Sequence, residues 1–160
     1  MISAKISGIP DLRAALAGIV PKLRRRALRN ALAAGARLVQ RSARAATPVL
    51  NPSALAVRKG YRTPGLVRKA INVRTSKVAR RRGDVGVFVN VRPAKRGARG
   101  AKNPNDPFYW RFIEFGTVNG TRAWQFLQRS ANVLPAALEV FKKTIGPAID
   151  KLNKPKAPAP

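Results

Sequence analysis

The chain has 160 residues, 45% of them hydrophobic, and carries 33 Lys and Arg against six Asp and Glu, for a formal net charge of +27. It contains no His and no Cys, which excludes disulfides, the usual zinc, haem and iron–sulfur sites, and Ser–His or Cys–His nucleophiles. The six acids are scattered, which disfavours paired-carboxylate catalysis. Composition therefore predicts a non-enzyme without a metal or cofactor.

The charge imbalance points to an acidic partner, because a small domain carrying +27 repels itself strongly. Nucleic acid, an anionic membrane surface and acidic protein neighbours are the candidate classes, and simple solubility is the alternative. No apolar run approaches the roughly 20 residues that span a bilayer. The N-terminus also lacks the basic and then apolar order of a signal peptide.

The length predicts a single domain, which we place over residues 1–153, followed by a flexible Pro- and Lys-rich tail over 154–160. Apolar residues at helical spacing predict a short helix near 11–19 and a long one near 21–46. The two are separated at Pro21, because proline is tolerated only in the first turn of a helix or at a kink. The alanines of the long helix favour helix formation and permit a neighbour to approach closely.

A Pro- and Gly-rich loop is expected over 47–65, followed by a short helix or strand entry. Alternating apolar residues then predict one strand starting at Ile71 and a second over 85–91. Arg80–Asp84 is predicted to form the turn of an antiparallel hairpin. Residues 93–106 are rich in Gly, Pro, Lys and Arg, which predicts a flexible basic loop.

Five of the ten aromatic residues lie between Phe108 and Thr117. This segment fits a short helix started by Pro107 and stopped by Gly116, whose positive φ ends it. A further helical turn is expected over 123–131. Apolar residues from Leu134 onward predict an amphipathic C-terminal helix with proline in its first turn.

Glu114 is a lone acid among aromatic residues, and a half-buried carboxylate needs a partner. Two alternatives stay open: an ion pair with an arginine of the same subunit, or a salt bridge across a subunit interface. We predict that four nearby aromatic side chains belong to the core rather than to a docking surface: Phe112, Phe115, Trp124 and Phe126.

Two basic segments are candidate contact sites: Arg80, Arg81, Arg82, Lys95, Arg96, Arg99 and Lys102. One interpretation is contact with DNA phosphates, which is independent of base sequence and sensitive to salt. The other is docking on an acidic protein neighbour. Solvated loops without a partner are the third alternative.

Several motifs occur together in a fixed order: Ile6-Ser7-Gly8-Ile9, an alanine-rich helix end before Thr47-Pro48, Gly65-Leu66, Tyr109 to Thr117 with Glu114-Phe115-Gly116-Thr117, and Phe126-Leu127. In this order the chain resembles the neck or tail-completion proteins of long-tailed bacteriophages, the head–tail joining or minor tail components. The resemblance runs through roughly residues 5 to 150.

The resemblance implies an α+β fold, with a small antiparallel β-sheet packed against a long N-terminal helix and a C-terminal helix. It marks Glu114, Phe115, Gly116, Thr117 and Phe126 as the family motif and interface.

It also implies a structural protein of the virion neck, assembled in the host cytoplasm, with no catalysis. A homo-oligomeric ring, expected to be a hexamer, would join the head-side connector or adaptor to the tail tube or tail terminator. DNA would pass through the ring, with sequence-independent contact to the genome, and no membrane is involved. The alternative function is a stand-alone basic nucleic-acid-binding protein.

Overall fold

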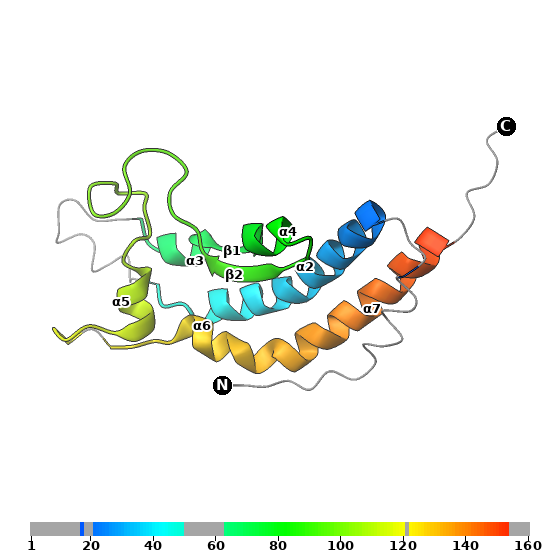
Figure 1. Cartoon of the computed structure of the whole chain (residues 1–160). Helices are drawn as coiled ribbons and strands as arrows, with labels where there is room; N and C mark the ends of the chain where they lie inside the picture. Colours follow the sequence, from blue (N-terminus) through cyan, green and yellow to red (C-terminus); the bar gives the residue numbers. More distant parts are fainter. Residues whose placement is uncertain (1–16, 18–20, 50–62, 121, 154–160) are drawn as a thin grey trace.

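The computed structural model describes residues 17, 21–49, 63–120 and 122–153. Outside these residues lie the tail over 154–160, most of the 47–65 loop and all of the predicted helix near 11–19 except residue 17. The described part has a long helix, α2 (Pro21–Ala46), that contacts a two-stranded antiparallel sheet and also the C-terminal helix α7 (Leu134–Asn153), as Figure 1 shows. The predicted α+β fold, with these elements packed together, is confirmed.

Small residues form the face of α2 that meets α7. Ala27 and Ala31 are buried against Ile145 and Ile149, and Gly35 is buried one further turn along. The three small residues are spaced four apart, so they lie on one side of the helix. A β-carbon on Gly35 would lie only 2.5 Å from the carbonyl oxygen of Ala137. The two helix backbones therefore approach too closely there for any side chain.

We expect Gly35→Ala to lower the free energy of unfolding by about 1–3 kcal/mol, because the added methyl group meets backbone rather than a side chain that can move. Gly146→Ala in α7 is the matched control, since a β-carbon there meets no atom within 4 Å apart from its chain neighbours. Alanine has a higher helix propensity than glycine, but a residue with a side chain is disfavoured in helical conformation directly before a proline such as Pro147. The two effects oppose each other, so we expect little change in the free energy of unfolding. Urea denaturation followed by circular dichroism measures both. Equal losses for the two variants would contradict the close approach.

The predicted hairpin is confirmed, with β1 (Ile71–Thr75) paired to β2 (Val87–Val91) and Ile71 opposite Val91. It follows a short helix, α3 (Leu66–Ala70). The turn predicted over Arg80–Asp84 is present in part: a short helix, α4 (Lys77–Arg81), includes its first two residues, and the turn itself lies at Arg82 and Gly83.

Local capping explains α4. The Ser76 hydroxyl accepts a hydrogen bond from the Ala79 N–H at 3.1 Å, which satisfies one of the free donors at the start of the helix. Gly83, with φ of 84°, follows the helix and donates its N–H to the Arg80 carbonyl at 3.2 Å. A non-glycine residue rarely adopts this φ, so Gly83 marks the reversal toward β2.

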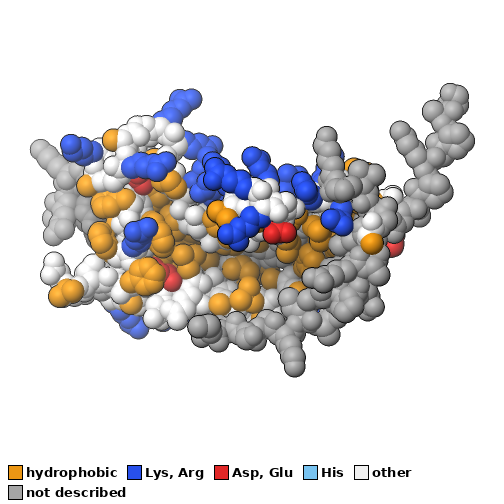
Figure 2. Space-filling model, viewed as in Figure 1, with side chains coloured by type: hydrophobic (Ala, Val, Ile, Leu, Met, Phe, Trp, Pro, Cys, Tyr) orange, Lys and Arg blue, Asp and Glu red, His pale blue; other side chains and the backbone are white. Residues whose placement is uncertain are grey.

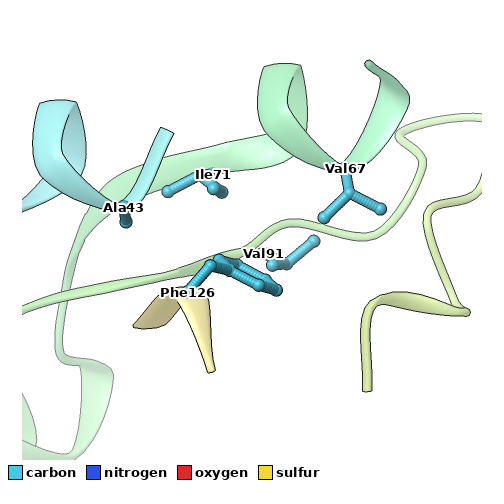
Figure 3. Packing of buried hydrophobic residues seen from close by; sticks show 5 residues of the cluster. All are labelled: Ala43, Val67, Ile71, Val91 and Phe126. Atoms are coloured by element: carbon cyan, nitrogen blue, oxygen red, sulfur yellow. The ribbon is translucent and has the colours of Figure 1, made fainter. Parts of the chain in front are cut away.

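Five elements meet in a second hydrophobic cluster, drawn in Figure 3. Its buried residues come from α2, α3, β1, β2 and the short helix α6 (Phe126–Arg129): Ala43, Val67, Ile71, Val91 and Phe126. Phe126 is the largest of them and is fully buried. This cluster anchors the hairpin and the C-terminal half of the chain to the same end of α2.

The C-terminal half consists of α5 (Trp110–Phe115), α6, a 3-10 turn (Ser130–Val133) and α7. Gly116 follows α5 with φ of 77° and ψ of −178°, and its N–H donates to the Phe112 carbonyl at 2.9 Å. Only glycine adopts this conformation without strain. The predicted helix stop at Gly116 is therefore confirmed, as is the helix that begins near Pro135.

The basic loop over 93–106 contains hydrogen bonds of its own. The buried Asn103 donates its side-chain N–H groups to the carbonyls of Arg96 and Ala98, at 2.9 and 2.8 Å. The buried Asp106 accepts from the Gly100 N–H at 2.9 Å. Short polar side chains that pair with nearby backbone give the loop a defined path.

Candidate functional site

The Glu114 side chain caps the N-terminus of α6. It is only 3% exposed, and its two carboxylate oxygens accept hydrogen bonds from the N–H groups of Leu127 and Gln128, at 2.9 and 3.0 Å. These are free donors of the first turn of α6. Within the described residues no arginine forms an ion pair with Glu114, and its partners there are backbone N–H groups.

The backbone reinforces this joint between α5 and α6. The N–H of Trp124 donates to the Ile113 carbonyl at 2.8 Å, and that of Gln125 donates to the Glu114 carbonyl at 3.1 Å. Gln125 adopts a left-handed conformation with φ of 51°, an uncommon state for a residue with a side chain. The Glu114-Phe115-Gly116-Thr117 motif is thus architectural, because it ties the end of α5 to the start of α6.

The segment between these two helices projects as a loop. The Thr117 carbonyl accepts from the Gly120 N–H at 3.2 Å and closes a turn within it. Val118 in this turn is fully exposed.

Three of the four aromatic residues predicted to be core are on the surface. Phe126 is buried as expected, but Phe112, Phe115 and Trp124 are 49%, 71% and 40% exposed. For Phe112 and Phe115 the reason is the short length of α5, which packs only one side on the core. Trp110 and Ile113 occupy that side, and Phe112 and Phe115 share another.

We call the exposed apolar group of α5 and the loop after it the aromatic corner: Phe112, Phe115, Val118 and Trp124. Arg122 borders it and lies over the Trp124 ring at 5.8 Å, and on the same short helix Arg111 lies over the Trp110 ring at 5.6 Å. Exposed apolar groups rimmed by polar residues mark surfaces for protein contact.

The seven basic residues singled out in the sequence are all exposed, but they fall into two groups. Arg80 and Arg81 belong to α4, and Arg82 follows directly as its cap. Lys95, Arg96, Arg99 and Lys102 lie on the loop after β2. Since the five residues of β2 separate the groups by roughly 16 Å, they do not form one patch.

A basic groove that sequence reasoning did not single out lies between α2 and β1. It has a volume of about 380 Å³ and presents three exposed arginines, Arg29, Arg37 and Arg74. The other described residues that line it are uncharged: Asn30, Ala33, Gln40, Asn72, Val73, Thr75 and Val87. The spacing of Arg25, Arg29 and Arg37 by multiples of four was the available signal, but it fitted a solvated helix face equally well.

One wall of this groove is the free edge of β1. The N–H of Arg92 donates a hydrogen bond to the carbonyl of Ala70, and the N–H of Ser76 donates one to the carbonyl of Gly86. These two bonds flank the paired strands, so the even-numbered residues of β1 are the ones that exchange backbone hydrogen bonds with β2. By the alternation of antiparallel ladders, the backbone groups of Ile71, Val73 and Thr75 face away from β2.

The same edge faces α2. The Ile71 carbonyl accepts from the side chains of Gln40 and Arg44, both at 2.8 Å. Among the described residues, none accepts a hydrogen bond from the N–H of Val73 or Thr75. The groove therefore offers backbone donors beside its arginines.

The basic surface continues from the groove to α4. A β-carbon on Gly83 would lie 3.7 Å from a guanidinium nitrogen of Arg25, which places the first arginine of the α2 row beside the end of α4. Figure 2 shows Lys and Arg side chains gathered along this side of the molecule. The row on α2 and the α4 group thus form one extended basic surface.

Other kinds of site find no support in the described part of the chain. There, no three His, Cys, Asp or Glu side chains come together as a metal site would require. None of the helices described is long and apolar enough to cross a membrane.

Residues 11–116 match the model of one protein family, HK97-gp10-like, whose description is "Bacteriophage HK97-gp10, putative tail-component". The match covers more than half of the chain. It includes α2, the hairpin and α5 and ends at Gly116, while α6 and α7 lie beyond it. No curated protein and no solved structure matched the chain.

Proposed function

Because the chain belongs to the HK97-gp10-like family of bacteriophage tail components, we propose that it forms a ring at the head-proximal end of the tail. The family supports a structural role in the virion rather than an enzymatic one. In the proposal, the ring stands in the neck, bridges the head-side connector or adaptor and the tail tube or tail terminator, and lets the genome pass through it.

The observation that carries the proposal is the match to a tail component over residues 11–116. Two surface features support the finer points. The extended basic surface suits a position beside DNA, because contacts to phosphate need positive charge and no base recognition. The aromatic corner suits a contact between proteins, since exposed aromatic side chains gain most when an interface buries them.

In a closed ring each subunit uses two different patches, one for each neighbour. We assign the aromatic corner to one of these patches, so that Phe112 and Phe115 pack on the neighbouring copy. Each copy carries +27, so neighbours repel until counter-ions or DNA phosphates screen the charge. Assembly therefore depends on ionic conditions, and a hexamer is the expected state.

We expect the purified protein to be monomeric at low salt and to assemble as salt rises, because the screening length falls from about 10 Å at 0.1 M to about 3 Å at 1 M. Mass photometry over this range measures the effect, and a short duplex DNA should promote assembly at lower salt. A reconstruction of the particle neck then gives the copy number. If the protein is monomeric under every condition and also in the particle, the proposed ring is wrong.

The same basic surface also fits a stand-alone nucleic-acid-binding protein. A deletion of the gene from a phage that encodes it separates the two functions. The proposed function requires filled heads and finished tails to accumulate unjoined. A stand-alone DNA-binding role leaves joining intact and changes only processes that act on the nucleic acid.

Two binding partners remain possible for the basic residues of the loop after β2, since they lie apart from the α4 group: Lys95, Arg96, Arg99 and Lys102. They contact either the phosphates of DNA or an acidic protein of an adjacent ring. Neutralising them and following both head–tail joining and DNA affinity separates the two, because only the first alternative changes the affinity of the isolated protein for DNA.

A further inference from the structure

We infer that the groove between α2 and β1 is a binding site for the phosphate backbone of nucleic acid. The inference rests on the proposed function only in taking DNA as the polyanion that the ring surrounds. It goes beyond that function by naming the surface that meets the phosphates.

The chemistry of the groove selects an anion that accepts many hydrogen bonds. Arg29, Arg37 and Arg74 each present planar guanidinium donors, and no described lining residue is acidic. Arginine forks match phosphate oxygens in pairs of parallel hydrogen bonds. The charges of the three side chains have no carboxylate partner in the groove, so the site carries net positive charge that a bound phosphate neutralises.

The edge of β1 adds backbone donors of fixed direction. The N–H groups of Val73 and Thr75 point away from β2 and line the groove. Backbone N–H groups that converge with arginines are a common arrangement for phosphate oxygens, because both are donors only. Thus the groove combines charge from α2 with oriented donors from β1.

The arginines Arg25, Arg29 and Arg37 of α2 form a row that is long enough to contact several phosphates of a nucleic-acid backbone. Arg25 and Arg37 are 12 residues apart on α2, which is about 18 Å along the helix axis. That length spans several consecutive phosphates of one strand. At the Arg25 end the row meets Gly83 and the arginines of α4, which extend it further.

The alternative occupant is an acidic peptide that adds a strand to the β1 edge. Such a peptide needs both donors and acceptors along several residues of the edge. The Ile71 carbonyl is already occupied by Gln40 and Arg44, so only two residues of the edge remain open. The carbonyls of Val73 and Thr75 face the same way as their N–H groups, so the edge can pair with only a short stretch of peptide. The three arginines match phosphate oxygens whether or not the edge takes part, and we therefore favour nucleic acid.

The test compares two triple variants of the full chain that remove the same charge. Arg29→Gln, Arg37→Gln and Arg74→Gln neutralise the groove, while Arg129→Gln, Lys143→Gln and Lys151→Gln neutralise exposed positions on α6 and α7. Affinity for a mixed-sequence duplex is measured by fluorescence anisotropy over a range of salt. The groove variant should flatten the slope of log K against log salt by about 2.7, at about 0.9 for each phosphate that an arginine no longer neutralises. The control should change it by much less.

A second measurement uses the wild-type protein and does not depend on the folding of a variant. Amide hydrogen exchange followed by NMR should show slower exchange at Val73 and Thr75 when duplex DNA is added. Amides whose partners lie within the hairpin, such as that of Asn90, should change little. Polyglutamate peptide serves as the competing polyanion in the same experiment.

Three results overturn the inference. If the two triple variants flatten the slope of log K against log salt equally, only the net charge of the protein governs DNA binding. Protection of Val73 and Thr75 by polyglutamate but not by DNA means that the groove binds an acidic protein. Unchanged exchange at both amides with DNA bound means that the phosphates lie elsewhere. Ring formation is measured separately by mass photometry, so failure of the groove and failure of the ring are distinguishable.

Discussion

Glu114→Ala is expected to lower the free energy of unfolding by about 2–4 kcal/mol, the largest effect of any acid-to-alanine change in the described part of the chain. The carboxylate is buried and accepts hydrogen bonds from two backbone N–H groups of α6. Its removal leaves both donors without their protein partner. Thermal and urea denaturation, followed by circular dichroism, measure the loss.

Two control variants sharpen this prediction. Glu114→Gln keeps one oxygen acceptor and should lose about half as much stability, because one backbone donor regains a partner. Asp150→Ala removes an exposed acid and should change stability by less than about 0.5 kcal/mol. Equal stability for Glu114→Ala and Asp150→Ala would show that the cap contributes nothing.

The double change Phe112→Ser and Phe115→Ser is expected to abolish assembly while it leaves the folded monomer intact. Both rings are about half or more exposed in the single chain, so their loss costs the monomer little. An interface that buries them loses its aromatic anchors, which commonly carry most of the binding energy. Mass photometry at high salt measures assembly, and thermal denaturation measures the monomer.

Phe88→Ser is the matched control for this experiment. Phe88 is an aromatic residue of β2 with 40% exposure, but it lies outside the aromatic corner. Its replacement should leave assembly unchanged. If the double variant still forms rings, or if Phe88→Ser disrupts them equally, the aromatic corner is not the contact between copies.

Much of the fold follows from local patterns. The boundaries of α2 at Pro21 and Ala46 agree with the predicted helix near 21–46, because proline punctuates the sequence at both ends. The strands of the hairpin follow from strict alternation, and the stop after α5 follows from Gly116. Alternation and helix punctuation reflect short-range backbone preferences, so they are visible without any knowledge of the tertiary structure.

The helix α4 shows where local reasoning fails. The run of arginines before Gly83 suggested a turn, whereas a hydroxyl cap at Ser76 supports a helix of five residues. The signal was present in the sequence, but a short helix gains little from propensity alone. Its existence depends on the cap and on the two paired strands that fix its ends.

The sequence by itself determined the charge of this protein, the order of its long helices and its hairpin strands, and its resemblance to phage tail components. Only the tertiary structure decided which side of α5 is buried, that Glu114 holds the backbone of Leu127 and Gln128, and that Arg37 and Arg74 face one groove. Periodicity reports which residues share a face of one element. Which faces meet depends on packing between elements distant in the chain, and a local pattern carries no record of it.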